Sequence, residues 1–122
     1  MHWKSNVQTS TDAQWLVWEC DGMPRWVVVL DGWLGSTCQI HQASLKTTAP
    51  PRSMIRAVFK HGFRVMKRTH IFGVVNSKDE SVVRLDKWLG FREIYRVPGA
   101  HIRGGDIVLL EMTPADCRWL ET

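Results

Sequence analysis

Two Asp-Gly pairs, Asp21-Gly22 and Asp31-Gly32, divide the first third of the chain into short segments rich in Trp, Val and Leu. Aromatic and β-branched residues favour strands, and Asp-Gly is a strong signal for a tight turn between antiparallel strands. The pattern therefore predicts a hairpin followed by a further strand. The three predicted strands are residues 15–20, 26–30 and 33–42.

The rest of the chain alternates between helical and strand patterns. Ile55, Val58 and Phe59 recur at helical spacing after Pro50-Pro51, which predicts a helix over 51–61. Ser77 and Glu80 have the spacing of a capping box, and Gly90 is a suitable helix end. We predict a mixed sheet, with residues 33–42 and 69–75 as a parallel pair. The later elements are a helix that ends at Gly90, strands over 91–97 and 106–112, and a helical turn in the tail.

Composition narrows the class of protein. The chain has 122 residues, 44% of them hydrophobic, which predicts a single globular domain over residues 1–122. No apolar run is long enough to span a bilayer, and no signal peptide is visible, so we expect no membrane partner. Three cysteines without a CxxC pair favour a reducing compartment, and we predict a cytoplasmic location.

Basic charge is concentrated in one segment. Gly32 to Lys78 contains eight Lys and Arg residues and no Asp or Glu, although the net charge of the whole chain is only +4. A local positive field favours a polyanionic ligand, such as a phosphorylated cofactor or a nucleic-acid backbone. A solvated basic face without a ligand is the alternative interpretation. His61, His70 and His101 lack ligand spacing, so we predict no metal site.

Residues 75–91 resemble a known family. Val75-Asn76, a short helix through Ser81–Leu85, and Leu89-Gly90-Phe91 resemble a conserved block of the GNAT superfamily of acetyl-CoA-dependent N-acetyltransferases. The end of the chain, 105–120, looks like small GNAT-like proteins of bacteriophages. The resemblance covers roughly Trp15 to Leu120. It implies an α+β fold, in which a mostly antiparallel sheet with a central parallel strand pair is flanked by helices and shortened at its N-terminus.

The resemblance implies acetyl-CoA (coenzyme A) as the cofactor and an unidentified amine as the acceptor. The family holds the pyrophosphate with the backbone N–H groups of a glycine-rich loop, but residues 42–53 here contain no glycine and two prolines. Hydroxyls, amides and basic side chains are the possible substitutes, and loss of cofactor binding is the alternative. The expected cofactor-binding residues are Ile40, Gln42, Thr48, Arg52, Ser53, Arg56, Asn76 and Leu85.

The expected catalytic residues are His41 and Glu19. His41 ends the third predicted strand, where an imidazole could accept the proton of the amine, and Glu19 is the alternative base. Many family members protonate the leaving thiolate with a tyrosine of the second helix. Alignment from Gly90 puts Asp86 at that position, and an ionised aspartate cannot donate a proton.

Three functions are consistent with these features. The first is an N-acetyltransferase in which the amine attacks the thioester directly. The second is a catalytically degenerate GNAT-like module that binds a host protein or a virion component of a bacteriophage. A nucleic-acid-binding module ranks last, because no recognised motif supports it. Trp15, Trp26, Trp88 and Trp119 are predicted core residues, whereas Trp3, Trp18 and Trp33 are predicted to be exposed and could mediate a homodimer.

Overall fold

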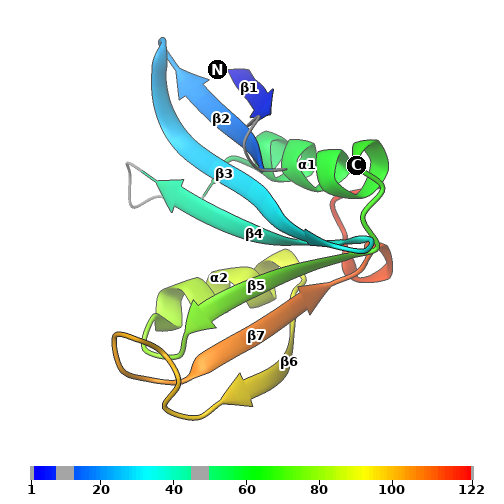
Figure 1. Ribbon diagram of the computed structural model, residues 1–122. Coiled ribbons are helices and arrows are strands. Elements are labelled where there is room, and N and C mark those ends of the chain that lie inside the picture. Colours follow the sequence, from blue (N-terminus) through cyan, green and yellow to red (C-terminus); the bar gives the residue numbers. More distant parts are fainter. Residues whose placement is uncertain (1, 8–12, 45–49, 122) are drawn as a thin grey trace.

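The computed structural model describes residues 2–7, 13–44 and 50–121. Within them, seven strands form one sheet in the order β1-β2-β3-β4-β5-β7-β6, as Figure 1 shows. Only β4 and β5 pair in parallel, so the predicted α+β fold with one central parallel pair is confirmed. The strands are β1 (His2–Val7), β2 (Gln14–Cys20), β3 (Met23–Leu34), β4 (Thr37–Ser44), β5 (His70–Asn76), β6 (Arg92–Val97) and β7 (Ile107–Met112).

Two helices connect the central strands. α1 (Arg52–Lys60) continues into a π-helical turn, His61–Val65, and α2 (Glu80–Leu89) follows β5. Gly62 lies inside this continuous helical segment, where a Cβ atom would come within 2.9 Å of Ile71 Cδ1. The glycine therefore lets the segment pack closely against β5. A short 3₁₀ helix, Pro114–Asp116, confirms the predicted helical turn in the tail.

Both helices cover the same face of the sheet (Figure 1). Alternate residues of each strand point to that face because side chains alternate along a strand. Ile71, Leu110 and Met112 are fully buried there, under Val58 and Phe59 of α1 among others. The opposite face exposes large apolar side chains, including Trp15 and Val74. We call these two sides the helix face and the open face.

Three sequence predictions about strands and caps are wrong. β3 does not end at Asp31-Gly32 but runs to Leu34, because Gly32 at φ 64° forms a bulge and the turn follows at Gly35. The first predicted strand begins at Trp15, yet β1 precedes it and pairs with β2. Ser77 does not cap α2: its hydroxyl accepts a hydrogen bond from the Asp106 N–H instead.

The tryptophan predictions are correct for Trp26 and Trp119, which are buried. They are wrong for Trp15 and Trp18, because Leu16 and Trp18 share the helix face and leave Trp15 38% exposed. The core prediction is also wrong for Trp88, which is 43% exposed, although its ring centroid lies 5.4 Å from that of Trp119. The side chains of Trp3 and Trp33 lie outside the described residues.

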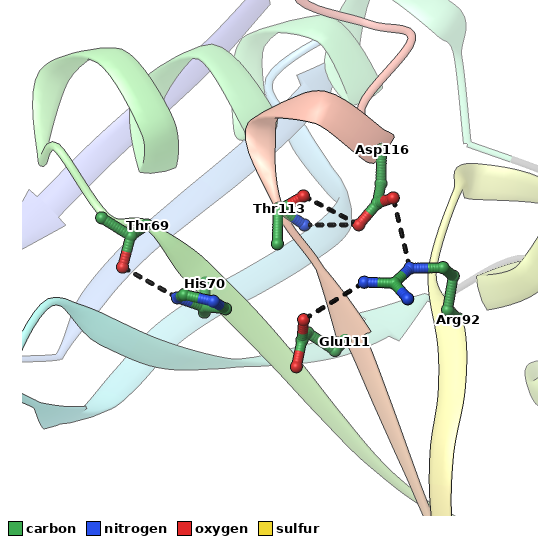
Figure 2. Close-up of polar contacts among 6 residues, drawn as sticks. All are labelled: Thr69, His70, Arg92, Glu111, Thr113 and Asp116. Carbon is green, nitrogen blue, oxygen red and sulfur yellow. Dashed lines mark hydrogen bonds and ion pairs between the residues drawn. The ribbon is translucent and has the colours of Figure 1, made fainter.

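A polar cluster ties the end of the sheet to the C-terminal turn (Figure 2). Arg92 of β6 pairs with Glu111 of β7 at 3.4 Å and with Asp116 at 3.2 Å. The Asp116 carboxylate also accepts hydrogen bonds from the Thr113 N–H and hydroxyl, and these bonds lower its pKa. The turn after β7 is thereby held against the β6–β7 hairpin.

Candidate active site between the parallel strands

The ribbons of β4 and β5 diverge towards one end (Figure 1). A cavity of about 270 Å³ lies between them there. The two strands pair only from Thr37 with His70 to Gln39 with Phe72. Beyond that point the backbone edge of β4 turns away from β5, and Ile40 to Gln42 line one side of the cavity. Gly73 to Asn76 line the other side. Because a strand directs half of its N–H and C=O groups to each neighbour, this edge offers backbone hydrogen-bonding groups to a ligand.

Because it lies in a gap in the sheet, the cavity receives side chains from both faces. If the parallel register continued, Ile40 would stand opposite Gly73 and His41 opposite Val74. Ile40 and Gly73 belong to the helix face, whereas His41 and Val74 belong to the open face. A ligand threaded between the strands would therefore present one side to each face.

His41 is held by an acidic neighbour on β3. Its Nε2 lies 2.8 Å from Asp31 Oδ1, and its side chain is 52% exposed. In the neutral imidazole, a proton on Nε2 directed at Asp31 leaves the Nδ1 lone pair available as an acceptor. The pair therefore has the arrangement of an oriented base.

Asn76 is 5% exposed and holds the loop between β6 and β7. Its Nδ2 donates to Gly104 O at 2.9 Å and to His101 Nδ1 at 3.2 Å. Its Oδ1 accepts from the Lys78 N–H at 3.1 Å. Gly105 passes so close to Asn76 that a Cβ atom there would overlap Oδ1. Asn76 thus joins the end of β5 to the loop that closes the cavity mouth.

We predict that Asn76→Ala destabilises the protein by about 1–3 kcal/mol, because it removes the hydrogen bonds that this buried side chain makes to Lys78, His101 and Gly104. Urea unfolding measures the change. Ile102→Ala in the same loop is the control, because Ile102 is 96% exposed and its truncation should change stability by less than about 0.5 kcal/mol. Equal stability of Asn76→Ala and wild type would contradict the assigned role.

Asp86 lines the helix-face side of the cavity and is 6% exposed. Burial raises the pKa of its carboxyl group to about 7. Val82 and Leu89, also on α2, line the cavity beside it. His101 and Arg103 approach from the loop before β7, where Arg103 lies 3.8 Å from Asp79.

The structure brings together four of the predicted site residues: Ile40, His41, Gln42 and Asn76 all line this cavity. Ile40, Gln42 and Leu89 also line a smaller cavity that reaches Pro50 and Met54, at the start of α1. The two cavities are therefore adjacent, and together they connect the gap between the strands with the beginning of the helix.

Five other predicted residues do not line either cavity. Glu19 lies towards the β2–β3 turn: the strand register aligns His41 with Val29 and Trp15, not with Glu19. Ser53 and Arg56 lie on α1 outside both cavities, and Leu85 packs against the core. The Arg52 guanidinium stacks on Trp88 and Trp119, at 5.7 and 5.8 Å from the ring centroids. Thr48 lies outside the described residues.

The described residues contain no group of three His, Cys, Asp or Glu side chains arranged to hold a metal ion. In the same part of the chain, no helix has the length and apolar character needed to cross a membrane. Cys38 and Cys117 are buried free thiols.

This chain resembles known proteins in its structure, with low sequence identity. No family model matches the sequence, and no curated protein matches it. A mutant spermidine N-acetyltransferase from Vibrio cholerae superposes with a TM-score of 0.75 at 14% identity, over 89% of this chain and 69% of that one. A GNAT-family acetyltransferase from Bacillus anthracis superposes with a TM-score of 0.69 at 15% identity, over 83% of this chain and 65% of that one.

This chain has the GNAT fold. The likeness predicted from residues 75–91 is thereby confirmed at the level of the fold. The chain spans about two thirds of the length of these GNAT structures. The predicted likeness to bacteriophage proteins stays a prediction.

The sequence analysis places Asp86 at the position of the family's tyrosine but does not predict that it is buried beside the cavity. One signal was present: Asp86 is four residues after Val82 and three before Leu89, so all three lie on one side of α2. His101 and Arg103 gave no such signal, because only the folded loop brings them to the end of β5.

Proposed function

We propose that this protein is an acetyl-CoA-dependent N-acetyltransferase that transfers an acetyl group to an amine. The observation that carries the proposal is the gap between β4 and β5, with the His41–Asp31 pair at its open-face side. The GNAT fold of the structures that superpose on the chain supports it.

Two features fit acetyl-CoA. The unpaired backbone edge at Ile40–Gln42, with Asn76 across the cavity, can accept the amide groups of the pantetheine arm. The start of α1 can accept phosphate, because its first N–H groups lack helical partners and its first turn contains no acidic residue. We assign phosphate contacts to Arg52, Ser53 and Arg56, together with Thr48, and a packing role to Leu85.

Acetyl-CoA, when bound, supplies a thioester carbonyl that an amine can attack directly. His41 accepts the proton of the amine on Nδ1, while Asp31 holds the other ring nitrogen. Backbone N–H groups of β4 orient and polarise the carbonyl oxygen. We do not assign Glu19 as the base, because it lies at the end of β2 that leads into the β2–β3 turn.

The binding of acetyl-CoA is the first test. Calorimetric titration should show binding of acetyl-CoA and of desulfo-coenzyme A, and Arg52→Ala should weaken both. No binding at millimolar ligand would contradict the enzyme and leave the alternative, a GNAT-like module that binds another protein. In that alternative, exposed Trp15 and Trp88 are the candidates for a homodimer or partner interface.

We predict that His41→Gln lowers kcat by about 100-fold without changing the affinity for acetyl-CoA, because it removes the proton acceptor and preserves the shape. Release of the thiol is followed with a panel of primary amines that begins with spermidine, the substrate named for the Vibrio protein. His70→Gln is the control, because His70 lies on β5 beside Thr69 and outside the cavity. Equal loss in both variants would refute the assignment of His41.

A further inference from the structure

The loop between β6 and β7, residues 98–106, carries a histidine whose ring orientation is fixed by the backbone. The Arg103 N–H donates to His101 Nδ1 at 3.1 Å, and Asn76 Nδ2 donates to the same atom at 3.2 Å. A backbone N–H can only donate, so Nδ1 carries a lone pair and the neutral ring has its proton on Nε2. His101 is partly exposed and lines the cavity. Within the described residues no group accepts the Nε2–H, which is therefore available to a ligand.

Asn76 directs both of its amide protons to this loop. One proton on Nδ2 bonds Gly104 O at 2.9 Å, and the other bonds His101 Nδ1. Its Oδ1 accepts from the Lys78 N–H, which fixes the end of the amide that faces the loop. Asn76 is therefore a positioning residue, and His101 is the residue that presents an N–H donor to the cavity from this end of β5.

Hydrogen bonds within the loop hold this arrangement in place. The His101 N–H donates to Gly105 O at 3.2 Å, and the Gly104 N–H donates to His101 O at 2.9 Å. At the base of the loop, the Gly99 N–H donates to Asp106 Oδ1 at 2.9 Å. Gly104 and Gly105 have φ values of 78° and 94°, which residues with a side chain rarely adopt. A donor that is held in place before binding costs little conformational entropy when a ligand binds it.

His101 and His41 reach the cavity from the same face of the sheet. Side chains alternate along β5, so Asn76 shares the open face with Val74, whereas Gly73 belongs to the helix face. Asn76 is buried on the open face because the loop covers it, and His101 bonds its side chain there. His41 lies on the open face of β4 across the gap. An amine that gives its proton to His41 would therefore have the His101 donor on the other side of the cavity.

The charges around His101 favour a ligand oxygen. Arg103 lines the cavity from the same loop, and its side chain is 73% exposed. Lys78 Nζ also lies close to the loop. Asp79 lines the same rim at 3.8 Å from Arg103, but exposed ion pairs at this distance contribute little. A carboxylate or carbonyl oxygen fits these donors and cations, whereas a second ammonium group, as in a polyamine, would be repelled by them.

We propose that the His101 Nε2–H and the Arg103 guanidinium bind an oxygen of the acceptor substrate. The inference rests on the proposed function and names its substrate class: a primary amine with a carboxylate or carbonyl group beside the amino group. A free amino acid supplies a carboxylate, and the N-terminus of a peptide supplies an amide carbonyl. In either case the amino group faces His41 and the oxygen faces the loop.

The kinetic test compares amines that share one alkyl chain. Leucine carries a carboxylate, leucinamide carries a carbonyl, and isopentylamine carries neither. For each, kcat/KM is measured on the full chain and expressed per unprotonated amine. The wild type should prefer leucine or leucinamide to isopentylamine by about 10-fold or more. Preference for leucine would identify a free amino acid as the acceptor, and preference for leucinamide would identify a peptide N-terminus.

Variants of His101 isolate the donor from the loop structure. His101→Asn keeps an acceptor near the Nδ1 position and has no group at Nε2, so it should lower the preference over isopentylamine by about 10-fold. His101→Gln, whose amide N–H reaches the Nε2 position, should retain most of the preference. Ile102→Ala is the control in the same loop, since Ile102 is 96% exposed, and its preference should equal that of the wild type. Equal preference in the wild type and His101→Asn would overturn the inference.

The second test needs no acetyl-CoA. Nitrogen-15 NMR of the histidine rings should show neutral His101 with its proton on Nε2. Titration with leucine or leucinamide should shift the Nε2 signal of His101, and isopentylamine at the same concentration should not. A proton on Nδ1, or equal shifts with all of these amines, would overturn the inference. A wild type that acetylates no amine would contradict the proposed function, whereas a selective shift of His101 in that protein would still support the oxygen site.

Discussion

The free energy of unfolding of the wild type should fall by about 4 kcal/mol, relative to that of Asp86→Asn, between about pH 4 and about pH 8. The pKa of Asp86 is 3.8 in its ordinary state and about 7 in the folded protein. Between these values the folded protein retains a proton that the unfolded chain has released. Stability therefore declines as the pH rises through this window and levels off above about pH 7. Asparagine cannot ionise, so its variant lacks this decline.

Urea unfolding of both proteins across this pH range measures the effect. Other groups also titrate, such as His61, whose pKa burial lowers, but they are common to both proteins and cancel in the difference. Glu80→Gln should show no such divergence from the wild type. Parallel curves for wild type and Asp86→Asn would mean that the folded protein hydrates this carboxyl group.

Phe59→Ala should destabilise the protein by about 3–5 kcal/mol. Phe59 is 2% exposed, and its ring lies 6.4 Å from Phe63 and 6.0 Å from Phe91. Its removal would leave a cavity where α1 meets Phe91, two residues after the end of α2. The start of α1, which we assign to phosphate binding, should then lose its support as well.

The midpoint and slope of chemical unfolding provide the measurement. Val65→Ala is the matched control, because Val65 belongs to the π-helical turn that extends α1 and is 67% exposed. Its truncation should cost less than about 0.5 kcal/mol. If the two variants were equally stable, Phe59 would not be part of a well-packed core.

Local patterns were sufficient for most of the elements. Spacing of apolar residues located α1 and α2, and Gly90 ends α2 at φ 124° as expected. Strand ends were less predictable. Asp31-Gly32 has the composition of a turn, but pairing of β3 with β4 continues past it and converts Gly32 into a bulge. Where a strand ends depends on its pairing with a neighbouring strand, and the residues of one strand do not reveal that pairing.

The candidate site was predictable in part. The resemblance to GNAT proteins pointed to Ile40, Gln42 and Asn76, and position at the end of a strand pointed to His41. All four line the cavity. The structure also shows that Asn76 donates hydrogen bonds to the loop between β6 and β7, about 25 residues later in the chain. For Arg52, the basic residue near the start of α1 that we assign to phosphate, the structure adds a packing contact. Its guanidinium stacks on two tryptophans, contributed by α2 and the C-terminal turn.

The sequence by itself determined the order of the strands and helices that follow β1, because periodicity and turn residues act over a few neighbouring positions. It also pointed to the parallel pair between the third strand and the strand after α1. Only the tertiary structure decided the protonation of Asp86. That property depends on how much water reaches the carboxyl group, and Gly73, Val82 and Leu89 set this together from two separate elements. The same residue type on the exposed side of α2 would be an ordinary anion.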